Sequence, residues 1–109
     1  MITEKGWGRH DKQRMVKMTG GDQNILAKAL RSAQEEAGPE LSGQLQPFLD
    51  RVLRMPKHKL YLNDEEYQYA TLSLNRMRNA YLEENRSCGG IDRLLIKLMQ
   101  AKYRCAPAR

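Results

Sequence analysis

A row of basic side chains near the C-terminus has the spacing of one helix face. Its members follow one another at intervals of four, three and four residues, and residues at these intervals are neighbours on a helix surface. They are the basic residues Arg93, Lys97 and Arg104 and, between them, the polar Gln100. Such a ridge on an otherwise buried helix can lie on a phosphate backbone or in a groove of nucleic acid, although a solvated helix face carries the same pattern. Arg86, just before this helix, adds a further cation.

A second basic group belongs to the middle of the chain. It consists of Arg51, Arg54, Lys57 and Lys59. Acids gather instead in the segment that follows, at residues 64–66 and 83–84, so charge is segregated along the chain. Segregated positive charge favours a polyanion as the partner. The two basic groups together are the predicted nucleic-acid contacts.

Aromatic and apolar side chains suggest a different kind of partner. Tyr69, Leu72 and Arg76 are spaced by three and four residues, so they share one face of a predicted helix, away from its core stripe. Exposed Tyr and Arg are typical of the centre of a protein interface, but these residues can also pack within the domain. Trp7, between two glycines in a basic segment, can stack on a base or fill a partner's pocket. These four residues are the predicted protein-partner contacts, and a homodimer is the simplest version.

Residues for catalysis or metal binding do not gather at a recognisable spacing. The chain lacks phosphate-binding glycine loops, nucleophile elbows and zinc-protease motifs. Its soft metal ligands are His10, His58, Cys88 and Cys105. They lie far apart, whereas zinc sites use ligands at short spacing, so we predict no catalytic residue, no metal and no cofactor. The turn from Ser87 to Gly90 can accept an anion at a helix N-terminus, but a tight turn between helices explains it more simply.

Hydrophobic periodicity and helix-end signals predict four helices, at about residues 22–37, 39–55, 63–85 and 91–103. Asn63 and Glu66 form a capping box for the third helix, and Pro47 predicts a kink or break in the second. Residues 57–62 are an extended connection, 1–21 a flexible basic arm and 106–109 a short tail. The fold class is therefore all-α, with a single small domain over 22–105 arranged as a bundle or an orthogonal array.

Length and composition agree with this interpretation. The chain has 109 residues, of which 40% are hydrophobic, and a net charge of +6, which suits one folded basic domain. No apolar run is long enough to cross a membrane, and the start has no signal-peptide pattern. Two cysteines fit a reducing compartment. We expect a cytoplasmic protein that does not bind membranes.

The sequence therefore predicts a non-enzymatic, nucleic-acid-binding protein in a regulatory role, which contacts phosphates of DNA or RNA through a basic helix ridge. The alternative is a protein-interaction module that binds an acidic protein surface. It would be an adaptor or inhibitor in the style of phage or mobile-element accessory proteins. The residues themselves indicate no known family.

Overall fold

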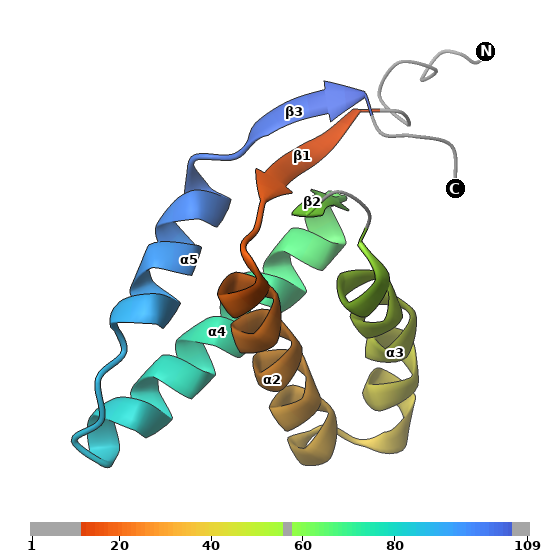
Figure 1. Ribbon diagram of the computed structural model, residues 1–109. Helices are drawn as coiled ribbons and strands as arrows, with labels where there is room; N and C mark the ends of the chain where they lie inside the picture. The colour runs from red at the N-terminus through yellow and green to blue at the C-terminus, as the bar shows by residue number, and fades with distance from the viewer. Residues whose placement is uncertain (1–11, 56–57, 106–109) are drawn as a thin grey trace.

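Two helices separate each strand from the next in the computed structural model, which describes residues 12–55 and 58–105 (Figure 1). The order is β1 (Lys12–Lys17), α2 (Gly20–Glu36), α3 (Pro39–Arg54), β2 (Lys59–Leu62), α4 (Asp64–Glu83), α5 (Gly89–Met99) and β3 (Lys102–Cys105). For residue 12 and residues 102–105 the description is limited to the backbone. The helices gather beneath the strands, with α2 in front of α4 and with α3 and α5 on either side (Figure 1).

The four helices of the described ranges make the fold a small, predominantly helical single domain, as predicted. The capping box of α4 is confirmed, because Asn63 accepts from the backbone N–H of Glu66 and the Glu66 carboxylate accepts from that of Asn63. In α2 the equivalent box joins Thr19 and Asp22. This helix therefore begins at Gly20, two residues before the predicted start.

The predicted break at Pro47 does not occur in the second helix, since α3 runs continuously from Pro39 to Arg54. A proline removes the hydrogen bond to the carbonyl four residues earlier, here that of Gly43. Both residues lie on the exposed side of α3, where water can take the place of the missing donor. The helix therefore continues, and the basic residues at its end stay on one rigid element.

The core lies where the helices meet the inner face of the sheet. Its largest fully buried side chains are Leu26, Leu30, Val52, Leu62, Leu74, Leu94 and Leu98. They come from all four helices and from β2, and α2 packs against α3, α4 and α5. Val16 of β1 and Leu60 of β2 close the core beneath the strands. Burial of this apolar surface is the main driving force for the fold.

A three-stranded antiparallel sheet, in the order β2–β1–β3, is the part of the fold that the sequence did not predict. Residues 12–17 form its middle strand, which corrects the predicted extent of the flexible arm. The reason is physical: β1 is stabilised by β2 and β3, which are distant in sequence and leave little local signal. Residues 1–11 of the predicted arm and the tail at 106–109 lie outside the described residues.

The last helix is shorter than predicted. α5 ends at Met99 with its C-cap at Gln100, whereas the prediction extended it to Tyr103. Residues 102–105 instead pair with β1. In the strand, the backbone N–H and C=O groups of these residues can form hydrogen bonds with β1, whereas the last carbonyls of a longer helix would have no partner within the helix.

Candidate nucleic-acid interface

The predicted ridge on α5 is not a free row of cations. Lys97 reaches across to α2 and binds the carboxylate of Asp22, whose side chain is only 12% exposed. Burial by itself raises the pKa of Asp22. The hydrogen bonds from Lys97 and Thr19 together outweigh this effect and hold the pKa of Asp22 below its ordinary value. Lys97 therefore ties α5 to the start of α2 and has a structural role.

The stabilisation by Asp22 should depend on pH. Its pKa is lower in the folded protein than the ordinary value of 3.8, so the ionised form stabilises the fold above that value. The contribution is lost as the pH falls through the folded pKa. We expect Asp22→Asn to lower stability at neutral pH and to flatten the loss of stability below about pH 4. Urea unfolding over a pH series measures this, and parallel acid limbs for the two proteins would contradict it.

The outward side of α5 is partly apolar, which also departs from the prediction. Ile96 is 48% exposed and Met99 is 67% exposed, whereas the sequence predicted a helix that is buried outside its basic ridge. Arg93 is exposed, and within the described part of the chain no carboxylate pairs with it. Arg104 belongs to β3, where only its backbone is described, opposite Gln13 of β1. The structure therefore removes Arg104 from the predicted row and pairs Lys97 within the domain.

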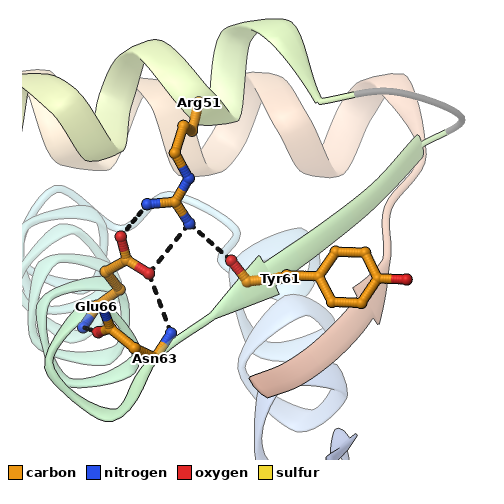
Figure 2. A network of polar contacts seen from close by, with 4 residues as sticks. All are labelled: Arg51, Tyr61, Asn63 and Glu66. Atoms are coloured by element: carbon orange, nitrogen blue, oxygen red, sulfur yellow. Dashed lines mark hydrogen bonds and ion pairs between the residues drawn. The ribbon is translucent and has the colours of Figure 1, made fainter. Parts of the chain in front are cut away.

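Arg51 is held in a network of polar contacts between α3, β2 and α4 (Figure 2). Its guanidinium binds both carboxylate oxygens of Glu66, with 3.0 Å between Nη2 and Oε1, and donates to the carbonyl of Tyr61 at 2.7 Å. The same carboxylate accepts from the backbone N–H of Asn63 at 3.0 Å. A guanidinium with these partners is not free for phosphate, so Arg51 fixes the end of β2 against α3 and α4.

The remaining basic residues of the prediction lie at different places. Arg54 is exposed at the end of α3, and its Nε donates to the carbonyl of Asp50 at 3.3 Å. Arg86 lies with its guanidinium carbon 3.8 Å from the centre of the Tyr81 ring and pairs with Glu84 at 3.2 Å. Lys59 is in β2, and Lys57 lies outside the described residues. Among the described residues, the predicted cations thus belong to different elements, and several of them are paired within the domain.

The predicted protein-partner residues are partly engaged within the domain. The Tyr69 hydroxyl donates to Gln44 Oε1 of α3 at 3.4 Å, and its ring packs against the core. Arg76 forms an ion pair with Glu36 of α2. Leu72 is 62% exposed, so of these three it alone presents a large apolar surface. Trp7 lies outside the described residues.

The strands, in contrast, carry a concentration of positive charge. Their sequences are KQRMVK in β1, KLYL in β2 and KYRC in β3, which contain six basic residues and no acid. Side chains alternate between the two faces of a strand. Leu60 and Leu62 point inward and are buried, so the outer face of β2 belongs to Lys59 and Tyr61.

The strand register brings these outer positions together. Lys17 is paired directly with Lys59, and Met15 with Tyr61. On the other side of β1, the register positions opposite Met15 and Gln13 are 102 and 104, a lysine and an arginine. We call this surface the basic sheet face: Gln13, Met15, Lys17, Lys59 and Tyr61, with register positions 102 and 104.

Arg14 is the exception among the strand cations, because it belongs to the inner face. Its guanidinium pairs with Asp64 of α4 at 2.7 Å and lies 4.0 Å above the centre of the Tyr67 ring. The inner cation is thus neutralised within the domain. In contrast, the three strands contain no acidic residue that could pair with Lys17 or Lys59.

The pairing of Lys17 with Lys59 is unfavourable for the fold itself. Directly opposed residues of an antiparallel pair have Cβ atoms about 5 Å apart, and like charges there are destabilising. Lys17 is exposed and Lys59 half-buried. A polyanion bound to this face would remove the repulsion. A destabilising arrangement of this kind points to binding rather than to stability.

Comparisons with protein-family models, with curated proteins and with solved structures give no match to this chain. The class is therefore defined by its own architecture: a small, predominantly helical domain with one three-stranded sheet, whose outer face is basic. Within ranges 12–55 and 58–105, no group of three or more His, Cys, Asp or Glu side chains is arranged to hold a metal ion. No helix in these ranges has the length and apolarity needed to span a membrane.

Proposed function

We propose that this protein binds nucleic acid through the basic sheet face, in a regulatory and non-enzymatic role in the cytoplasm. The observation that carries the proposal is the directly opposed pair Lys17 and Lys59 in a sheet whose strands contain no acid. The predicted class of partner is kept, and the predicted contact surface moves from α5 to the sheet. Of the residues predicted from sequence, Lys59 belongs to this surface, and position 104 is opposite Gln13 in the register.

The spacing of the sheet suits a phosphate backbone. Neighbouring strands lie about 4.8 Å apart and alternate residues of a strand about 6.8 Å apart. The positive charges of the face are therefore spread over several strands and are not concentrated at one position. Each phosphate that a lysine neutralises releases condensed counterions, which gives salt-dependent affinity without sequence preference.

The test is binding of labelled single-stranded DNA, RNA and duplex DNA, measured by fluorescence anisotropy over a salt series. We expect affinity to fall steeply with salt. In the Lys17→Gln/Lys59→Gln variant, the log–log slope should become shallower by about one to two units, because two phosphate contacts are lost. The matched control is Lys28→Gln/Arg31→Gln, which removes two exposed charges on α2, about 13–18 Å along the helix from Thr19.

Two results would contradict the proposal. One is the absence of binding to every form of nucleic acid at low salt. The other is a control variant that loses as much affinity as the double lysine variant, because binding would then follow total charge and not the sheet.

A protein partner, including a second copy of the chain, is the alternative, and exposure of Leu72 favours it. The Leu72→Ser variant should then lose partner binding or self-association and keep its stability, because the side chain is not in the core. Sedimentation velocity of wild type and variant measures self-association.

A further inference from the structure

Tyr61 occupies a special position on the basic sheet face. It lies between two buried leucines of β2 and is therefore on the opposite side of the strand from the core. Figure 2 shows its ring pointing away from the ion pair of Arg51 and Glu66, while its carbonyl accepts from Arg51 at 2.7 Å. The backbone beneath the ring is thus fixed by a charged hydrogen bond, and the ring stands on a rigid strand.

Cations border this ring. Lys59 is two residues earlier on the same strand face, at a spacing of about 6.8 Å, and Lys17 is the cross-strand partner of Lys59. Met15, directly opposite Tyr61, supplies an apolar neighbour. An aromatic ring beside a row of ammonium groups combines the two elements that bind single strands: a stacking surface for a base and charges for the adjoining phosphates.

The bases of duplex nucleic acid cannot stack on such a ring. In a double helix the flat faces of the bases are stacked on one another, so that only base edges and backbone are accessible. In a single strand a base can turn outward and stack on an aromatic side chain. The ring would therefore contribute to affinity for single strands only, whereas the lysines would act on both forms.

We propose that the basic sheet face is a site for single-stranded nucleic acid, with one base stacked on Tyr61 and the neighbouring phosphates at Lys59 and Lys17. This inference rests on the proposed function and adds the class of ligand and the residue that selects it. Stacking uses the face of the ring, so the phenol oxygen is not required. DNA and RNA single strands share this chemistry.

The experiment compares Tyr61→Leu with Tyr61→Phe. Probes are labelled thymidine and uridine homopolymers and a mixed-sequence DNA duplex, all at low salt. We expect Tyr61→Leu to bind both homopolymers about tenfold to a hundredfold more weakly, since stacking of one base on an aromatic ring contributes on this scale. Tyr61→Phe should bind within about twofold of wild type, because the ring is kept, and duplex binding should be unchanged in both variants.

The controls separate this inference from the proposed function. Thermal unfolding of each variant reports whether the fold is kept, and the comparison of single strands with duplex in wild type provides a test even if the leucine variant unfolds. Two results would overturn the role of Tyr61 and leave binding by the lysines intact. One is duplex that binds to wild type as tightly as single strands do. The other is a Tyr61→Phe variant whose affinity for single strands is as low as that of a folded Tyr61→Leu variant. Loss of all binding in wild type at low salt would instead remove the proposed function.

Discussion

Replacement of Arg51 by alanine is expected to lower the free energy of unfolding by about 2–3 kcal/mol, since removing one member of a largely buried ion pair leaves a charge without a partner. The Glu66 side chain is only 11% exposed, so water cannot fully replace the guanidinium. The carbonyl of Tyr61 also loses its donor. Small domains are stable by about 5–15 kcal/mol in total, so this one change should shift the urea midpoint strongly at neutral pH.

Two further variants identify the cause. Arg54→Ala removes an exposed arginine from the same helix, and we expect a change within about 0.5 kcal/mol. Arg51→Ala/Glu66→Gln should recover much of the lost stability, because Gln removes the orphaned charge and can keep the capping box with Asn63. If Arg51→Ala unfolds at the same urea concentration as wild type, the network does not hold β2 to the helices.

The helices of this fold were predictable from sequence because their signals are local. The box of Asn63 and Glu66 lies within four residues, and the apolar stripe of α4 repeats within the helix itself. The sheet was not predictable in this way. β1, β2 and β3 contain six, four and four residues and are separated by entire helices. Strands this short show only two or three periods of alternation, and their pairing is a non-local property.

The candidate site shows a similar division. The sequence correctly located excess positive charge, but a helical wheel reports only which residues share a face. It does not report what that face contacts. Lys97 was expected in solvent and instead binds Asp22, which is distant in sequence but adjacent in space. The signal that was available for the sheet was the composition of KQRMVK, KLYL and KYRC, in which each strand begins with a lysine and none contains an acid.

The opposed lysines give a prediction in which stability and binding change in opposite directions. Lys59→Glu replaces a like-charge pair with an opposite-charge pair across β1 and β2. We expect the free energy of unfolding to rise by about 0.5–1 kcal/mol, the scale of a cross-strand charge pair. Affinity for nucleic acid at low salt should fall about a hundredfold, because one phosphate contact is lost and a repulsive charge is added. Urea unfolding and anisotropy on the same preparations measure both.

Together with Lys59→Glu, the variants Lys17→Glu and Lys17→Glu/Lys59→Glu complete a double-mutant cycle. Lys17→Glu should behave like Lys59→Glu, whereas Lys17→Glu/Lys59→Glu restores like charges across the strands and should lose the gain in stability while binding falls further. Such a reversal of sign requires the two residues to be direct neighbours, as the register has them.

Equal stability of all four proteins would mean that the pair does not interact. A Lys59→Glu variant that binds within about twofold of wild type would show that the phosphates lie elsewhere, since each contact contributes more than this at low salt. If the opposed lysines serve binding, their repulsion lowers the stability of the free protein, so a variant without the repulsion should be more stable and should bind nucleic acid more weakly.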